Sequence, residues 1–146
     1  MASLIVTVFK QDGSIRLCGD YSATVNKFLD PVQTPLPTVD EVISQIGRAS
    51  IFSKIDLSQA FLKLPLDDVS KQYTVINTPD GLYQYNYLPF GLTSSPGIFQ
   101  SFMTRILAHI KNIIVYQDDI LILSPDNDSH LKTLREVLTT LKKHRY

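Results

Sequence analysis

The chain has 146 residues, of which 44% are hydrophobic and 19% charged, and its 14 basic and 14 acidic residues cancel. This composition is typical of one ordinary globular domain. Zero net charge neither supports nor excludes a nucleic-acid partner, because local fields matter more than the sum. A single cysteine excludes a disulfide framework and a cysteine-based zinc site. No apolar run reaches the roughly 18 residues of a membrane span, so no membrane partner is expected.

The first third of the chain predicts a hairpin, a loop and a helix. Residues 4–10 and 14–21 are rich in β-branched and aromatic residues and flank an Asp12-Gly13 turn signal. Residues 26–37 contain three prolines, which favour an extended loop. The sequence TVDE that begins at Thr38 has the pattern of a capping box and predicts a helix that ends at Gly47.

The middle of the chain predicts strands. Residues 50–57, SIFSKIDL, predict one strand. Residues 71–78 and 82–88 flank a Pro-Asp-Gly turn and predict a second hairpin. Ser95 followed by Pro96 predicts the start of a helix.

The last third predicts a helix, a hairpin and a helix. The first helix has an apolar face, made by Phe99, Phe102, Met103, Ile106 and Ile110. The segment IIVYQDDILIL, residues 113–123, predicts two strands joined by a tight turn. Leucines at helical spacing then mark the final helix, namely Leu131, Leu134, Leu138 and Leu141.

This order predicts an α+β fold with a ferredoxin-like, split βαββα arrangement, in which helices cover one face of an antiparallel sheet. In such a sheet the strand ending at Asp56 can lie beside the later hairpin, whose turn carries Asp118 and Asp119. Three carboxylates in a small volume repel one another, and a hard divalent cation is the usual compensation. Two Mg²⁺ ions held in this way suit phosphoryl or nucleotidyl transfer.

A plainer interpretation of the Asp pair is structural, because aspartate is common in hairpin turns. The flanking residues weigh against it. A tyrosine, one variable residue and two aspartates stand between aliphatic strands, and another strand upstream ends in aspartate.

Four blocks, in order, resemble the reverse transcriptases of LTR retrotransposons, nearest the gypsy class and more distantly those of retroviruses. They are VFKQDGSIRLCGDY from Val8, FSKIDLSQAFLKLPL from Phe52, LPFGLTSSPGIFQ from Leu88 and YQDD from Tyr116. The resemblance implies a ferredoxin-like palm, residues 31–63 and 95–146, and a hairpin-rich fingers part, residues 1–30 and 64–94. It implies no counterpart of the thumb, connection and RNase H regions.

The resemblance also assigns roles to particular residues. It implies catalysis by Asp56, Asp118 and Asp119, which would hold two Mg²⁺ ions together with the Leu57 carbonyl, Mn²⁺ being a possible substitute. It implies nucleotide binding by Lys10, Arg16, Ala60, Phe61 and Phe90, and contact with the primer end by Tyr116 and Gln117. Phe61 would crowd the sugar 2′ position, although core packing is an alternative role. Gly91 and Pro96 are expected to shape the backbone rather than bind ligand.

The implied partners are an RNA or DNA template with its primer, a dNTP and, if the chain is a fragment, the rest of a Pol polyprotein. The implied location is intracellular, in cytoplasmic particles or the nucleus.

A different class of function stays open, namely a non-catalytic retroelement remnant or nucleic-acid-binding module. A third hypothesis, an unrelated ferredoxin-like nucleotidyl cyclase, shares two-metal chemistry but does not account for LPFGLTSSP.

Overall fold

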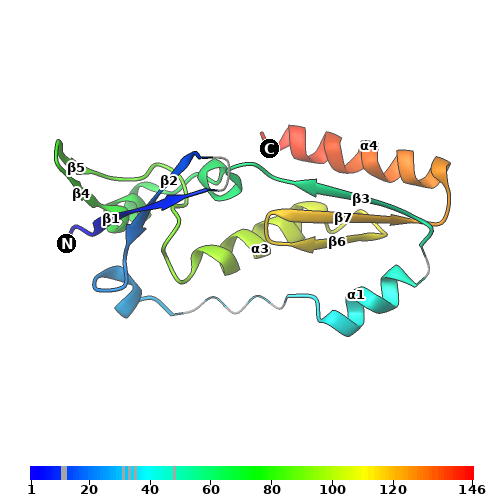
Figure 1. The fold of residues 1–146 in the computed structure, drawn as a ribbon, viewed down its shortest axis with the longest axis horizontal. Helices are drawn as coiled ribbons and strands as arrows, with labels where there is room; N and C mark the ends of the chain where they lie inside the picture. Colours follow the sequence, from blue (N-terminus) through cyan, green and yellow to red (C-terminus); the bar gives the residue numbers. More distant parts are fainter. Residues whose placement is uncertain (11–12, 31, 33, 35, 48) are drawn as a thin grey trace. The chain divides into compact units, whose positions relative to one another are not determined.

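The computed structural model describes residues 1–10, 13–30, 32, 34, 36–47 and 49–146. The chain forms two compact units (Figure 1), one made of residues 1–32 and 61–97 and the other of residues 33–60 and 98–146. Asp12 of the predicted first turn lies outside the described residues, as do residues 31, 33 and 35 of the predicted proline-containing loop.

The first unit is built on two small antiparallel hairpins. Strand β1 (Leu4–Phe9) pairs with β2 (Ile15–Asp20), and β4 (Ile76–Thr78) pairs with β5 (Gly81–Tyr83). A single parallel bridge between Ser3 and Ile76 joins the two hairpins. The short 3₁₀ helix η1 (Val25–Lys27) occupies the start of the predicted extended loop.

The second predicted hairpin is much shorter than expected. The first half of the predicted strand over residues 71–78 is helical instead, in α2 (Asp68–Lys71) and the 3₁₀ helix η3 (Gln72–Thr74). The Asp67 carboxylate accepts hydrogen bonds from the backbone N–H groups of Val69 and Ser70. This N-cap stabilises a helical turn where the β-branched composition alone favoured a strand.

The core of the first unit surrounds Tyr21, which is fully buried together with Leu88. The Tyr21 hydroxyl donates a hydrogen bond to the Thr74 carbonyl, 3.1 Å away. Gly91 packs against this core with φ of +101°, and a Cβ there would overlap the Gly19 carbonyl oxygen. Gly91 therefore shapes the backbone, as predicted.

The second unit contains the predicted βαββα order. A three-stranded antiparallel sheet has the order β3-β7-β6, from β3 (Ile51–Asp56), β6 (Ile113–Tyr116) and β7 (Asp119–Ser124). Helix α3 (Ser95–Leu107) enters this unit before β6, and α4 (Asn127–Lys143) follows β7. The predicted neighbourhood of the upstream strand and the later hairpin is thus confirmed (Figure 1).

Helix α4 runs along the sheet and contacts β7 and β3. The buried His130 ring joins the helix to both strands, through Ser53 on β3 (2.7 Å) and Ser124 on β7 (3.1 Å). The helix buries Val137 and Leu141, whereas two of the leucines that predicted it are exposed, namely Leu131 and Leu138. The predicted helix is correct, but its buried face is rotated from the leucine stripe.

Helix α1 (Val39–Ile46) begins with the predicted capping box. The Thr38 hydroxyl accepts from the Glu41 N–H, and the Glu41 carboxylate accepts from the Thr38 N–H at 2.7 Å. The hydrogen bond that the Thr38 N–H donates to the Glu41 carboxylate is the main cause that lowers the pKa of Glu41, because it favours the charged form. None of the described residues of this helix is buried. In the part of the chain that the structure describes, no helix has the length and apolar composition needed to cross a membrane.

Candidate active site

The end of the β3-β7-β6 sheet carries an acidic group, defined here as Asp56, Asp118 and Asp119. Asp56 is the last residue of β3 and stands directly opposite Asp119, the first residue of β7. The Leu57 N–H then donates to the Asp118 carbonyl at 2.9 Å, which continues the pairing one step beyond the strands. The backbone therefore brings the three predicted catalytic residues and Leu57 together, although they come from distant parts of the sequence.

The turn between β6 and β7 sets the position of Asp118. Tyr116 stands opposite Asp119, so only Gln117 and Asp118 form the turn. Gln117 has φ of +52°, a left-handed conformation that is strained for a residue with a side chain. Asp118 is exposed at the tip, and Tyr116 is 49% exposed. The predicted primer-end residues thus lie beside the acidic group.

Gln100, to which the sequence pattern assigned no role, is hydrogen-bonded to this turn and to the strand before it. Its side chain on α3 is 2% exposed. The side-chain oxygen accepts from the Gln117 N–H at 2.6 Å, and the side-chain nitrogen donates to the Val115 carbonyl at 2.9 Å. Gln100 is the last residue of the block LPFGLTSSPGIFQ. An amide side chain next to an otherwise apolar helix face was the sequence signal that could have identified Gln100 as a residue of the site.

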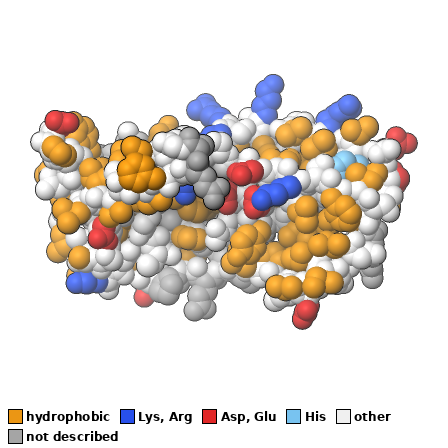
Figure 2. All heavy atoms as spheres, in the orientation of Figure 1, with side chains coloured by type: hydrophobic (Ala, Val, Ile, Leu, Met, Phe, Trp, Pro, Cys, Tyr) orange, Lys and Arg blue, Asp and Glu red, His pale blue; other side chains and the backbone are white. Residues whose placement is uncertain are grey.

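Lys54 provides positive charge next to the acidic group. Its ammonium nitrogen lies 2.9 Å from an Asp119 carboxylate oxygen. The hydrogen bond and charge of Asp119 raise the pKa of Lys54, and the charges of Asp56 and Asp118 raise it further. Figure 2 shows acidic side chains gathered with a basic one at this end of the sheet, beside hydrophobic side chains farther along it.

The acidic group is not a preassembled metal centre. Across the described ranges, no set of three or more Asp, Glu, His or Cys side chains is arranged to hold an ion. The donor chemistry nevertheless suits a hard cation, because all three aspartates act electrostatically on the one Lys54 ammonium. The chemistry of these carboxylates therefore fits a divalent ion, whereas their arrangement here does not form one coordination sphere.

In the first unit, three of the predicted nucleotide-binding residues form a stack. The Arg16 guanidinium lies over the Phe90 ring, 4.5 Å from its centre. The Phe90 and Phe61 rings are 5.1 Å apart between centres and tilted by 38°. Such cation–π and aromatic contacts each contribute on the order of 0.5–1.5 kcal/mol.

The other two predicted nucleotide-binding residues lie outside this stack. Lys10 follows β1, and its N–H donates to the Ser14 carbonyl in the hairpin. Ala60 is buried at the start of the 3₁₀ helix η2 (Ala60–Lys63), next to Phe61 in the chain.

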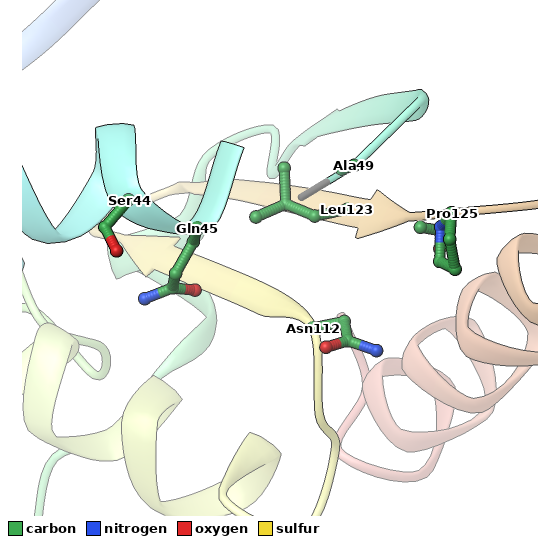
Figure 3. Close-up of a pocket in the computed structure, with 7 residues that line it drawn as sticks. Ser44, Gln45, Ala49, Asn112, Leu123 and Pro125 are labelled. Atoms are coloured by element: carbon green, nitrogen blue, oxygen red, sulfur yellow. The ribbon is translucent and has the colours of Figure 1, made fainter. Parts of the chain in front are cut away.

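A separate pocket of about 450 Å³ lies at the opposite end of β7 (Figure 3). The end of α1, the residues preceding β3 and β6, and the end of β7 line it. The lining residues are Ser44, Gln45, Ala49, Asn112, Leu123, Ser124 and Pro125. None of them is acidic or basic, so this pocket lacks the charge pattern of the sheet's other end.

Comparison with known proteins identifies the family. Residues 8–146 match the family model described as reverse transcriptase (RNA-dependent DNA polymerase). The chain is 31% identical over 140 residues to the Transposon Tf2-3 polyprotein of Schizosaccharomyces pombe, covering 94% of this chain and 10% of that protein. It is 33% identical over 144 residues to the uncharacterized protein K02A2.6 of Caenorhabditis elegans, covering 98% of this chain and 11% of that protein.

Solved structures agree with the sequence relatives. The foamy viral protease-reverse transcriptase in complex with double-stranded DNA superposes with a TM-score of 0.89 at 29% identity, over 99% of this chain and 25% of that one. The foamy viral protease-reverse transcriptase in complex with an RNA/DNA hybrid gives a TM-score of 0.85 at 28% identity, over 99% of this chain and 19% of that one. The chain spans about a tenth of the curated relatives' length. The chain belongs to the reverse transcriptase (RNA-dependent DNA polymerase) family.

Proposed function

We propose that the acidic group is the catalytic centre of template-directed transfer of a nucleotide from a dNTP to a primer 3′-OH. The observation that carries this proposal is the β3-β7 register, which sets Asp56 opposite Asp119 and bonds Leu57 to Asp118. Carboxylates converge there at an exposed sheet end. We further propose that residues 1–30 and 64–94 are the fingers and residues 31–63 and 95–146 the palm, bounds that lie within three residues of those of the two compact units.

The carboxylates of the acidic group and the Leu57 carbonyl would hold two Mg²⁺ ions. When bound, such ions lower the pKa of an attacking hydroxyl and neutralise charge on the triphosphate and the leaving pyrophosphate. The donor set supports this proposal because oxygen ligands on flexible, exposed side chains suit hard cations. Mn²⁺ takes oxygen ligands as well and should substitute.

Residues beside the acidic group would position its substrates. Gln100 fixes the turn that bears Asp118, so that the carboxylate is presented from a rigid backbone. Tyr116 and Gln117, in the same hairpin as Asp118 and Asp119, would contact the primer end. For the first unit taken by itself, we propose that Arg16 contacts a triphosphate and that Phe61 excludes a ribose 2′-OH by steric contact.

The test is metal-dependent dNTP incorporation on a poly(A)·oligo(dT) template. The matched control is Asp118→Asn, which keeps the size of the side chain and removes its charge. We expect slow, distributive extension that needs Mg²⁺ or Mn²⁺ and disappears in the variant. Binding of the template should weaken above roughly 0.1–0.2 M salt, because few basic residues are available for phosphate contacts.

The competing hypothesis is a non-catalytic remnant that only binds nucleic acid. It predicts template binding without metal-dependent extension, both in the 146-residue chain and in a fusion with a homologous thumb. Extension by the fusion, but not by its Asp118→Asn variant, would exclude the remnant hypothesis. Equal behaviour of the two fusions would exclude the catalytic assignment instead.

A further inference from the structure

Lys54 lies on the same face of the sheet as the acidic group. It precedes Asp56 by two residues on β3, and alternate residues of a strand point to the same side. Its direct partner across the sheet is Leu121, so Asp119 is its diagonal neighbour. A diagonal position is within reach of a long side chain, and the ammonium reaches the Asp119 carboxylate at 2.9 Å.

This pair differs from an ordinary surface ion pair in what surrounds it. An exposed pair of opposite charges usually contributes little to stability, and the side chains here are 61% and 39% exposed. The Lys54 ammonium, however, is paired with Asp119 at 2.9 Å, on the carboxylate that stands opposite Asp56 across the sheet. The charges of Asp56 and Asp118 also act on it, so among the described residues it is a cation placed to offset the mutual repulsion of the three carboxylates.

We propose that Lys54 is a built-in counter-cation of the acidic group, which holds Asp119 in the metal-free protein and competes with a divalent ion for it. This inference rests on the proposed function, since it concerns the same carboxylates. A divalent ion at the acidic group would repel the ammonium and take over its partner. Because the lysine side chain is long, flexible and mostly exposed, it can swing into solvent at little cost.

The competition has a defined direction. Without Lys54, the Asp119 carboxylate would not be paired with an ammonium group, and the charge of Lys54 would no longer repel a metal ion. The affinity of the acidic group for the metal ion should therefore rise. With arginine in this position the charge stays, and the planar guanidinium can pair with the carboxylate through two hydrogen bonds. Metal affinity should then stay at the parent level or fall.

The experiment measures the dissociation constant of Mn²⁺ by titration calorimetry in the whole 146-residue chain. Lys54→Met removes the charge and keeps most of the side-chain length, while Lys54→Arg keeps the charge. The matched control is Lys71→Met, which removes a lysine that is paired with Asp68 at 2.7 Å in the other unit. Asp118→Asn reports whether the acidic group binds the ion.

We expect Lys54→Met to bind Mn²⁺ about three- to tenfold more tightly than the parent, with the gain shrinking as salt is added. Lys71→Met should bind like the parent, and Asp118→Asn should bind more weakly. If Asp118→Asn weakens binding but Lys54→Met does not strengthen it, the counter-cation proposal is wrong and the metal site stands. If Asp118→Asn binds like the parent, the metal site is wrong, and the counter-cation proposal fails with it.

A second measurement tests the pair without metal. In EDTA, Lys54→Met, Asp119→Asn and the double variant should give non-additive shifts in Tm, because each single change leaves the other partner unpaired. Additive shifts would mean that the ion pair does not form in solution, and they would overturn the proposal whatever the metal titration shows.

Discussion

Asp56 at the end of β3 stands directly opposite Asp119 at the start of β7, so two like charges face each other across neighbouring strands. Such a pair destabilises a sheet unless a cation offsets it. Asp56→Asn should therefore leave the metal-free protein unchanged or slightly more stable. In saturating Mn²⁺ the parent should gain on the order of 3 kcal/mol at about 100 times the dissociation constant, and the variant should gain much less.

The measurement is urea unfolding with and without Mn²⁺. Asp68→Asn is a suitable control, because Asp68 is an exposed aspartate of the other unit. If Asp56→Asn and Asp68→Asn respond to Mn²⁺ equally, the metal-binding role of Asp56 is wrong.

Phe61 provides a second prediction, on substrate choice. Its ring packs on Phe90, which in turn supports Arg16, so the proposed nucleotide contacts form one rigid stack. Phe61→Val should open space beside the sugar and relax discrimination against ribonucleotides by roughly 10-fold or more. The dNTP/rNTP ratio of single-nucleotide addition measures this. Phe28→Val changes an 80% exposed ring of the same unit and should leave the ratio unchanged.

Much of this site was predictable from the sequence because its signals are local. Apolar runs on both sides of an Asp pair predicted the β6-β7 hairpin, and the order of elements predicted that β3 would lie beside it. The placement of Asp56 beside the turn that carries Asp118 and Asp119 therefore follows from the order of elements and the apolar pattern.

The pairing of Lys54 with Asp119 and the bonds of Gln100 were not predictable in this way. Both depend on the register between elements far apart in sequence, and a shift of one residue would send Lys54 to the other face. The strand predicted over residues 71–78 failed for a local reason, since the Asp67 cap favoured a helical turn over β propensity. The rotated face of α4 reflects the buried His130, whose two serine partners compensate its burial.

Gln100 gives a third prediction, on the rigidity of the catalytic turn. Gln100→Leu keeps the side-chain volume but leaves the buried Val115 carbonyl and the Gln117 N–H without this partner. We expect a loss of about 2–4 kcal/mol in the free energy of unfolding and a smaller response to Mn²⁺, because Asp118 loses its support. Gln84→Leu, at an exposed position, is the control. A stable variant with a full metal response would show that Gln100 does not position the turn.

Gly91 gives a fourth prediction, on backbone strain in the first unit. Gly91→Ala would place a methyl group in the left-handed region and against the Gly19 carbonyl, so a loss of at least about 3 kcal/mol is expected. Gly81→Ala has the same kind of backbone, with φ of +129°, but open space around the new methyl group. It should cost only about 1–2 kcal/mol. Equal losses for the two variants, measured by urea unfolding, would mean that the Gly91–Gly19 approach is not tight in solution.

Tyr21 gives the last prediction, on stability at alkaline pH. Burial raises the pKa of its hydroxyl well above the usual value near 10, and the neighbouring Tyr85 raises it further. A pKa that is higher in the folded than in the unfolded protein means that the neutral hydroxyl is favoured by folding. Its contribution is therefore complete below about pH 10 and is lost as the pH rises above it, because the unfolded chain then releases its proton first.

Unfolding by urea at pH 8 and at pH 11 tests this. The parent should lose stability between the two values, and Tyr21→Phe should lose less, since phenylalanine cannot ionise. At pH 8 the variant should be less stable than the parent by about 1 kcal/mol, because the hydrogen bond to the Thr74 carbonyl is gone. The exposed Tyr73 offers the matched change Tyr73→Phe, which should follow the parent at both pH values. The same alkaline loss in Tyr21→Phe and the parent would place the titrating group elsewhere.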